Sequence, residues 1–182
     1  MRRVVVTGIG TINSTGHNVK DSFEAVVNGV CGIDAITLFD ASEFSVKIAG
    51  EVKDFDPTTV MDKKEVKKAD RFIQLGIKAA LEAMIDSGYV TQEDKKVDAS
   101  IADRFGMISG SGIGGLSTIE RNSIVCETKG SRKVSPFFIP SSLANMLSGF
   151  ISIEHNLRGP SLSHVTACAA STHALNDAVK TI

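Results

Sequence analysis

The stretch Gly159–Leu175, GPSLSHVTACAASTHAL, decides the fold and carries the strongest chemical signal in the sequence. A Gly-Pro turn precedes a short segment of alternating and β-branched residues, and this pattern predicts a strand. Cys168 follows, and the residues directly after it are small and suited to the start of a helix. The stretch therefore predicts a cysteine at a strand-to-helix junction.

A cysteine at such a junction is favoured as a thiolate. Its sulfur lies near the unsatisfied N–H groups and the positive end of the helix dipole. Small neighbours also let a substrate carbonyl approach backbone N–H groups that stabilise an oxyanion. These neighbours are Ala167, Ala169, Ala170 and Ser171. The alternative is structural, because free cysteine is among the most buried residue types and alanine-rich runs also occur where helices pack closely.

Length and composition narrow the class of protein. The 182 residues, 42% of them hydrophobic, are enough for one domain with a core. The formal net charge is −1, from 20 basic and 21 acidic side chains, so no global field indicates nucleic acid or a membrane surface as partner. Three cysteines, at positions 31, 126 and 168, have no metal-ligand spacing and give no disulfide framework. We therefore expect no metal site.

The opening segment MRRVVVTGIG has an apolar run too short for a signal peptide or a membrane span. No later run reaches spanning length. We expect a cytoplasmic protein without a membrane partner, and a reducing cytoplasm agrees with the unpaired cysteines.

Arg3–Thr7, RVVVT, predicts a buried strand, because three consecutive valines suit a sheet that is covered on both faces. Gly8 and Gly10 end this strand with a loop that partly matches the dinucleotide-binding fingerprint. Asn13 stands where the third glycine of that fingerprint belongs. A strand followed by a tight glycine turn is therefore the better interpretation, and we expect no cofactor.

Two helices are predicted in the first half of the chain. Asn18–Asn28 has apolar residues at helical spacing and is closed by Gly29. Val30–Thr59 is a peripheral excursion with short apolar segments. Asp62–Ser87 is the longest stretch that follows the i, i+3, i+4 rule, and Gly88 stops it.

A basic cluster lies at the start of this long helical stretch, where the helix dipole favours acidic side chains instead. A solvated helix face is the ordinary explanation for such a run, and an acidic partner is the alternative. The cluster consists of Lys63, Lys64, Lys67 and Lys68, and a second basic pair, Arg132 and Lys133, precedes an aromatic turn.

The second half resumes with a strand at Phe105–Ser109 and a glycine turn at Gly110–Gly115. Such a turn can cradle a phosphate, but no Lys-Ser/Thr pair follows as a P-loop requires; glycines also allow backbones to approach closely. Residues 116–126 and 141–154 predict helices, the second with Asn145 in its middle. This order of elements indicates an α/β chain with a mostly parallel, covered sheet.

Together these motifs resemble the N-terminal half of the β-ketoacyl-acyl carrier protein synthases II, the condensing enzymes that elongate fatty acids. The matching segments run from the first residues to the last in the family's order. They are RRVVVTGIG, KKADRFIQ, SGSGIGG, SPFFIPSSLANMLSG, RGPSLS and TACAASTHAL. The resemblance implies a thiolase-like fold, an αβαβα architecture of five layers with a mostly parallel central sheet. Residues 1–182 would form its N-terminal domain, with the C-terminal half absent.

The resemblance also implies a reaction. Cys168 matches the family nucleophile, which accepts an acyl chain from an acyl carrier thioester. Malonyl-carrier is then decarboxylated, and its carbanion attacks the acyl-enzyme to give a 3-oxoacyl product longer by two carbons. The backbone N–H of Cys168 would be one oxyanion donor. The reaction needs no cofactor.

Further residues match family positions outside the nucleophile. Ile113 matches a residue that lines the acyl pocket, and Phe138 matches one that closes the pocket across the interface of a homodimer. The strand 161–166 matches the one that pairs across the two-fold axis. The positions where the family docks its acidic carrier protein are Lys64, Lys67, Lys68, Arg132 and Lys133.

The family completes its site with two histidines, a lysine and a second oxyanion N–H, all from the C-terminal half. The histidines at 17, 155, 164 and 173 do not match those positions. His173 lies five residues past Cys168, about 500° around a helix, and so on another face. His164 takes a place that is usually small or apolar. We expect this polypeptide to carry the nucleophile without the decarboxylation machinery, to be inactive alone and to expose surface meant for the missing half.

Two other functions remain open from the sequence. A non-catalytic dimerisation partner, similar to chain-length factors, would associate with an intact synthase, although such partners generally lack the nucleophile that Cys168 provides here. A dinucleotide-binding domain would use Gly8, Gly10 and the glycine turn, but these lack the required spacing.

Overall fold

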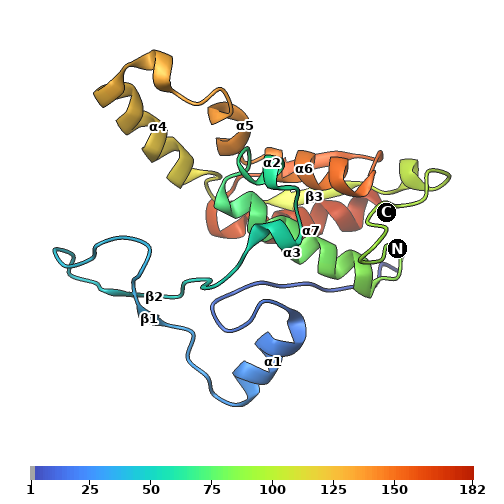
Figure 1. Ribbon diagram of the computed structural model, residues 1–182. Helices are drawn as coiled ribbons and strands as arrows, with labels where there is room; N and C mark the ends of the chain where they lie inside the picture. The colour runs from blue at the N-terminus through green and yellow to red at the C-terminus, as the bar shows by residue number, and fades with distance from the viewer. Residues whose placement is uncertain (1–2) are drawn as a thin grey trace.

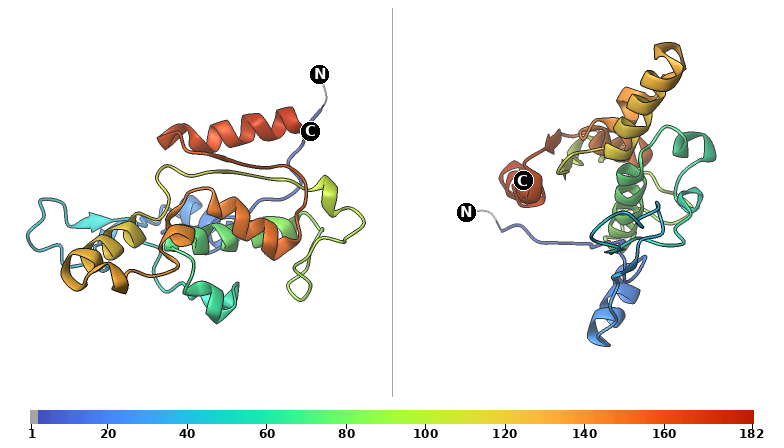
Figure 2. Two further views of the ribbon diagram at one scale, coloured as in Figure 1. Left: turned by 90° about the horizontal axis from the view of Figure 1, so that it is seen from above. Right: turned by 90° about the vertical axis from the view of Figure 1, so that its left-hand side faces the viewer.

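The structure, a computed structural model, describes residues 3–182 and has a mixed α/β fold (Figure 1). Two strands, β3 (Met107–Gly110) and β4 (Ser161–His164), lie between α7 (Ala170–Thr181) on one face and α3 (Arg71–Asp86) and α6 (Met146–His155) on the other (Figure 2). The other elements are α1 (Val19–Val27), β1 (Asp34–Ala35), β2 (Ile48–Ala49), α2 (Lys63–Val66), α4 (Leu116–Lys129) and α5 (Phe138–Ser142), with short 3₁₀ turns at Pro57–Thr59, Ala102–Arg104, Ser131–Lys133 and Ala167–Ala169.

The sheet at the centre of the layers is parallel, as expected. β3 and β4 pair in register from Met107 opposite Ser161 to Gly110 opposite His164. The described residues form no wider sheet, because the other pair, β1 with β2, is antiparallel and separate. The predicted excursion therefore contributes a small hairpin and not a further parallel strand.

The hairpin is held by hydrogen bonds at its surface. Lys53 donates to Asp34 at 2.8 Å, and this bond is the main cause of the lowered pKa of Asp34. The Thr37 hydroxyl donates to Glu51 at 2.7 Å and in the same way lowers the pKa of that carboxyl.

The predicted strand Arg3–Thr7 is wrong. The segment forms no strand in the structure, and Val5 and Val6 are 65% and 78% exposed. The valine-rich composition favours a sheet, but a strand forms only where a neighbour accepts and donates its hydrogen bonds. No described strand pairs with this segment.

Gly8 and Gly10 have a different use from the one in a dinucleotide fingerprint. A Cβ on Gly8 would lie 2.2 Å from the carbonyl oxygen of Ala83, and one on Gly10 would lie 2.1 Å from that of Ala79. The two glycines therefore let the N-terminal segment lie directly on the backbone of α3.

The core forms along α3, whose buried face carries Ile73, Ile77 and Leu81. The predicted helical periodicity is confirmed, and so is the stop, since Gly88 has a φ of +78°. The core also includes Val60, Met61, Ala69, Val90, Val97, Ile151 and Leu157.

The long helical stretch is interrupted before α3, at Asp70. The Asp70 carboxylate accepts from the backbone N–H of Phe72 at 3.3 Å, and so it caps α3. It also accepts from the backbone N–H and hydroxyl of Thr118, at 2.9 and 2.6 Å, in the first turn of α4. One buried side chain thus fixes the starts of two helices, which periodicity along α3 alone does not reveal.

The apolar helix expected at 141–154 is also divided. α5 ends at Ser142, Leu143 has an extended conformation, and α6 begins at Met146. Asn145 therefore lies between two helices, where it is exposed and needs no buried partner.

The helix expected at Asn18–Asn28 is confirmed as α1, with Asn18 as its N-cap and Gly29 at a φ of +68°. Its apolar residues, however, face solvent: Phe23, Val26 and Val27 are 69%, 66% and 67% exposed. An apolar face of this size is the kind of surface that proteins normally cover. No helix in the described part of the chain is both long and apolar enough to cross a bilayer.

Three serine hydroxyls join the two central strands to α6. Ser109 of β3 lies 2.7 Å from Ser148 of α6 and 3.1 Å from Ser163 of β4. Ser148 also lies 2.8 Å from Ser163 and donates to the carbonyl oxygen of Leu162 at 2.9 Å. Because Ser148 is buried, its hydroxyl satisfies groups that water cannot reach.

Replacing Ser148 with Ala should lower the free energy of unfolding by about 1–3 kcal/mol, because it leaves buried partners unsatisfied. The matched control is Ser152→Ala, one turn further along α6. The Ser152 hydroxyl oxygen is buried without a hydrogen-bond partner, so its loss should leave the stability unchanged or raise it. Urea unfolding followed by circular dichroism measures both, and equal effects of the two substitutions would contradict the role of the serine cluster.

Candidate active site

Cys168 lies at the expected junction. β4 ends at His164, the 3₁₀ turn Ala167–Ala169 contains the cysteine, and α7 begins at Ala170. The Cys168 side chain is exposed, and no described residue hydrogen-bonds to its sulfur. The structural alternative of a buried packing cysteine is therefore wrong for this residue.

The turn that holds Cys168, called here the elbow (residues 166–169), is tight. Ala167 has a φ of +49°, a left-handed conformation that costs about 1–2 kcal/mol for a residue with a Cβ. The backbone N–H of Ala169 donates to the carbonyl oxygen of Thr166 at 3.0 Å. The backbone N–H of Cys168 has no acceptor among the described residues, so it is free to donate to a ligand.

The glycine turn Gly110–Gly115 packs against the elbow. A Cβ on Gly110 would lie 2.4 Å from the carbonyl carbon and oxygen of Ala170, in the first turn of α7. The nearest atoms to a Cβ on Gly112 belong to the backbone of Ala167, at 3.7–3.8 Å. Of the two uses considered for these glycines, close backbone approach is the one that the structure shows.

The two residues expected to line an acyl pocket lie in different places. Ile113 follows Gly112 in the glycine turn and is 64% exposed, so it lies at the surface next to the elbow. Phe138 is half-buried on α5 and lines a groove of about 470 Å³ with residues of α3 and α4. Neither Ile113 nor Cys168 lines this groove.

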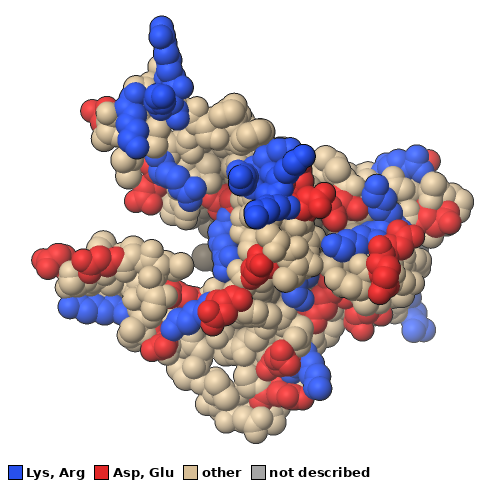
Figure 3. Space-filling view, viewed as in Figure 1, with Lys and Arg blue, Asp and Glu red and all other residues tan. Residues whose placement is uncertain are grey.

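The groove of Phe138 is basic. Of the residues expected to dock a carrier protein, Lys67 and Lys133 line it, and Arg71 and Arg121 add two cations that the sequence pattern missed. Lys68 lies beside the groove, paired with Glu65 and 5.7 Å from the centre of the Phe137 ring. Figure 3 shows lysine and arginine side chains gathered over α2 and near the end of α4. Lys64 belongs to α2, and Arg132 to the 3₁₀ turn that follows α4. Arg121 lies in a helix of weak amphipathicity, so no sequence signal identified the face it occupies.

Two histidines lie near the elbow without a hydrogen bond to the sulfur. His173 has its Nδ1 3.0 Å from the Thr166 hydroxyl oxygen, and His164 has its Nε2 3.1 Å from a carboxylate oxygen of Asp177. His173 is therefore engaged away from Cys168, as its helical position predicts. Within residues 3–182, no three His, Cys, Asp or Glu side chains form a group that could hold a metal ion.

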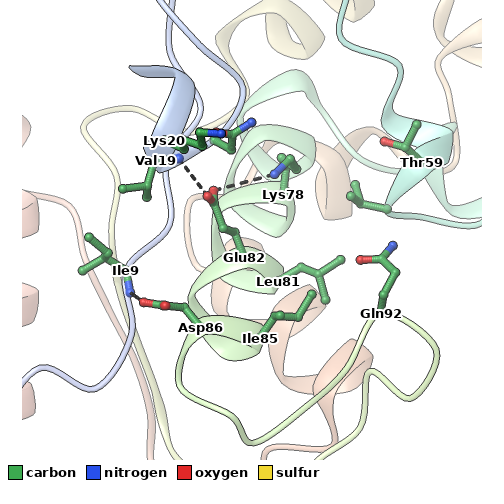
Figure 4. Close-up of a pocket in the computed structure, with 12 residues that line it drawn as sticks. Ile9, Val19, Lys20, Thr59, Lys78, Leu81, Glu82, Ile85, Asp86 and Gln92 are labelled. Atoms are coloured by element: carbon green, nitrogen blue, oxygen red, sulfur yellow. Dashed lines mark hydrogen bonds and ion pairs between the residues drawn. The ribbon is translucent and has the colours of Figure 1, made fainter. Parts of the chain in front are cut away.

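A separate cavity of about 620 Å³ lies between α1, α3 and the N-terminal segment (Figure 4). Its two carboxylates, Glu82 and Asp86, are already engaged. Glu82 accepts from the backbone N–H groups of Val19 and Thr11, at 2.7 and 3.1 Å, and Asp86 accepts from that of Ile9 at 2.9 Å. These bonds fix the N-terminal segment to α3, so this cavity is not the candidate site.

Comparison with known proteins finds relatives that match the whole chain. The family model described as beta-ketoacyl synthase, N-terminal domain, matches residues 1–182. The chain is 44% identical over 181 residues to the 3-oxoacyl-acyl-carrier-protein synthase 2 of Coxiella burnetii and 46% identical to that of Vibrio harveyi. In both cases the match covers all of this chain and 42% of the relative, so the chain spans less than half the length of these proteins.

Solved structures share the fold. A beta-ketoacyl synthase from Burkholderia phymatum superposes with a TM-score of 0.83 at 22% identity, over all of this chain and 44% of the other. A type II polyketide ketosynthase in complex with its acyl-carrier protein superposes with a TM-score of 0.79 at 23% identity, over all of this chain and 47% of the other.

Substituting Gly110 with Ala should push α7 away from β3. We expect unfolding free energy to fall by about 1–3 kcal/mol, as for other overpacked sites, and alkylation of Cys168 by iodoacetamide to slow. The control is Gly149→Ala inside α6, where the nearest atom to a new Cβ is Met146 Cε at 3.8 Å. Replacing this helical glycine with alanine should raise the free energy of unfolding by about 0.5–1 kcal/mol. Thermal unfolding measures the stability, and peptide mass spectrometry measures the alkylation rate. If Gly110→Ala changed neither, the close approach of α7 to β3 would be contradicted.

Proposed function

Because the chain belongs to the β-ketoacyl synthase family and matches its N-terminal domain, we propose that it carries the nucleophile of a 3-oxoacyl-acyl carrier protein synthase of type II fatty-acid elongation. One observation supports this most directly. Cys168 is exposed in a strained elbow before a helix of 12 residues, with its own backbone N–H unoccupied. Sulfur, helix dipole and oxyanion donor thus lie within one turn of chain.

The first half-reaction uses groups that this chain has. The Cys168 thiolate attacks the carbonyl carbon of an acyl carrier thioester, and the negative charge moves to the carbonyl oxygen, where the N–H of Cys168 donates to it. Collapse of this intermediate breaks the bond to the carrier's sulfur, which leaves as a thiolate. The acyl chain is now a thioester of Cys168.

The second half-reaction needs more groups than this chain places near the sulfur. Malonyl-carrier loses CO₂, its carbanion forms a carbon–carbon bond with the acyl carbonyl, and the Cys168 thiolate leaves with the electron pair. None of the four histidines is bonded to Cys168, and the relatives are more than twice as long as this chain. We propose that the remaining length of the complete synthase supplies the decarboxylating groups.

The larger assembly is proposed on the same basis. In a five-layer thiolase-like protein, a second α/β half would cover the apolar residues that are exposed here on α1 and at Val5 and Val6. The open edge of β4, with Leu162 44% exposed, would pair across the two-fold axis of a homodimer. Ile113 would line the acyl pocket, with Phe138 closing it from the partner subunit.

The basic groove is the proposed docking surface for the acidic carrier protein. It offers Lys67, Arg71, Arg121 and Lys133, with Lys64, Lys68 and Arg132 close by in the chain. The ketosynthase solved in complex with its acyl-carrier protein shows that a protein of this fold binds such a carrier. Electrostatic attraction of this kind steers association and weakens with salt.

Incubating the chain with an acyl carrier thioester should add one acyl group to Cys168 and yield no product extended by two carbons. Peptide mass spectrometry locates the acyl group, and product analysis detects elongation. Cys168→Ala should remove the label, whereas Cys31→Ala and Cys126→Ala should retain it. Absence of acylation would instead favour a non-catalytic partner of an intact synthase. Elongation by the chain alone would contradict the proposal that the decarboxylating groups come from outside these residues.

Reversing the charge of the groove should weaken carrier binding. Lys67→Glu together with Lys133→Glu is expected to raise the dissociation constant about tenfold or more at low salt, because each reversal replaces an attraction by a repulsion. Lys96→Glu makes the same change of charge on an exposed loop at the other end of α3 and should have little effect. Binding titrations at two salt concentrations distinguish an effect of the groove from an effect of net charge. If the groove variant and Lys96→Glu lost the same affinity, the groove would be excluded as the docking surface.

A further inference from the structure

We propose that the hydrogen bond between Thr166 and His173 is a positioning device for Cys168, which keeps the elbow in its strained conformation and the sulfur at the front of α7. The inference rests on the proposed function of Cys168 as the nucleophile. It assigns Thr166 and His173 as positioning residues and not as catalytic ones, because neither hydrogen-bonds to the sulfur and they bond to each other instead.

The bond closes a loop around the cysteine. Thr166 immediately precedes the left-handed Ala167, and His173 lies seven residues later, in the second turn of α7. The Thr166 hydroxyl oxygen and His173 Nδ1 are 3.0 Å apart. The entry to the elbow is thus tied to the helix that follows it, with Cys168 between the two attachment points.

The bond matters because Ala167 is strained and needs support from its surroundings. An alanine keeps a left-handed conformation only where its surroundings leave no alternative. The β4 side of the elbow is held because the backbone N–H of Ser111 donates to the carbonyl oxygen of His164 at 3.0 Å. The helix side is held by the packing of Ala170 on Gly110. Between these supports, the bond from Thr166 to His173 is the one side-chain hydrogen bond that the elbow makes among the described residues.

The chemistry of the pair suits a permanent tie. A hydroxyl both donates and accepts, so it bonds to neutral Nδ1 by donating and to a protonated ring by accepting. The bond is therefore compatible with both the neutral and the protonated ring. The charged or titratable groups around this ring are His164 of β4, whose ring centre is 5.7 Å away, and Asp177, one turn further along α7 and 3.1 Å from His164. Lys180 lies 4.0 Å from Asp177.

Loss of the bond would let the elbow relax and move the sulfur away from the N–H groups of the first turn of α7. Those groups favour the thiolate, so the pH at which Cys168 becomes reactive should rise. The bond is at the surface, and its loss should therefore leave the melting temperature almost unchanged. A change in reactivity without a change in stability is the signature of positioning.

The test is the rate of alkylation of Cys168 by iodoacetamide from pH 5 to pH 10 in the full chain, followed by peptide mass spectrometry. In this reaction the thiolate sulfur bonds to the methylene carbon, iodide leaves, and the thiol proton goes to the buffer. Thr166→Val and, independently, His173→Phe should move the midpoint of the profile up by about half a pH unit, which is about threefold in rate at neutral pH. Thr166→Ser, made in the original chain, keeps the hydroxyl and should leave the midpoint at its original value.

The matched control is Thr172→Val. Thr172 is an exposed threonine on α7 whose hydroxyl has no partner among the described residues, so the same substitution there should leave the profile unchanged. Profiles of Thr166→Val and His173→Phe that superpose on the original would overturn the inference, and so would a shifted midpoint in Thr166→Ser. If Cys168 of the unchanged chain titrates like the exposed Cys31 and Cys126, the proposed nucleophile itself is wrong, and the inference falls with it.

Discussion

The absent side chain of Gly110 is the constraint on which the rest of the structure depends. The backbone of α7 approaches β3 so closely that a Cβ at this position would lie 2.4 Å from the carbonyl group of Ala170. This contact sets the height of α7 above the central strands. Because Cys168 lies in the turn directly before the helix, the contact also sets where the sulfur lies. The serine cluster of Ser109, Ser148 and Ser163 acts on the opposite face, where it joins the same strands to α6. Both faces of the central pair are thus fixed by short contacts that tolerate little change in volume.

A second constraint positions the basic groove. The carboxylate of Asp70 caps α3 and also binds the first turn of α4, and a Cβ on Gly115 would lie 3.1 Å from Asp70 Cβ. Asn122 of α4 accepts from the backbone N–H of Ser135, and Ser141 of α5 donates to the carbonyl oxygen of Lys68. These bonds tie α4 and α5 to the start of α3, so cations from separate segments come together in one groove. The groove is a consequence of capping and not of any single basic run.

The sequence predicted what depends on local structure. The cap and glycine stop of α1, the apolar face of α3 and the junction at Cys168 follow from preferences that act over one or two turns of chain. Prediction failed where the outcome depends on distant residues. The valines of Arg3–Thr7 favour a strand, but no described neighbour pairs with them. The groove was only half predicted, because Arg71 and Arg121 reach it from helices whose relative position is set by Asp70. The same limit kept the bond from Thr166 to His173 out of view, since no pattern in the sequence places a hydroxyl opposite that ring.

Alanine at position 167 strains the elbow but limits it to fewer conformations. A glycine would adopt a φ of +49° without strain, but it would also have many other conformations open to it in both the folded and the unfolded chain. Alanine accepts about 1–2 kcal/mol of strain and has far fewer conformations to choose from. The choice works only because the residues on both sides of the elbow are held in place. His164 is held through the register of β4 with β3, and Ala170 through its contact with Gly110. The bond from Thr166 to His173 joins these two sides. With both ends held and the bond from Thr166 to His173 between them, the elbow keeps this conformation. For the proposed nucleophile, a fixed direction of approach to a carbonyl carbon matters more than the strain.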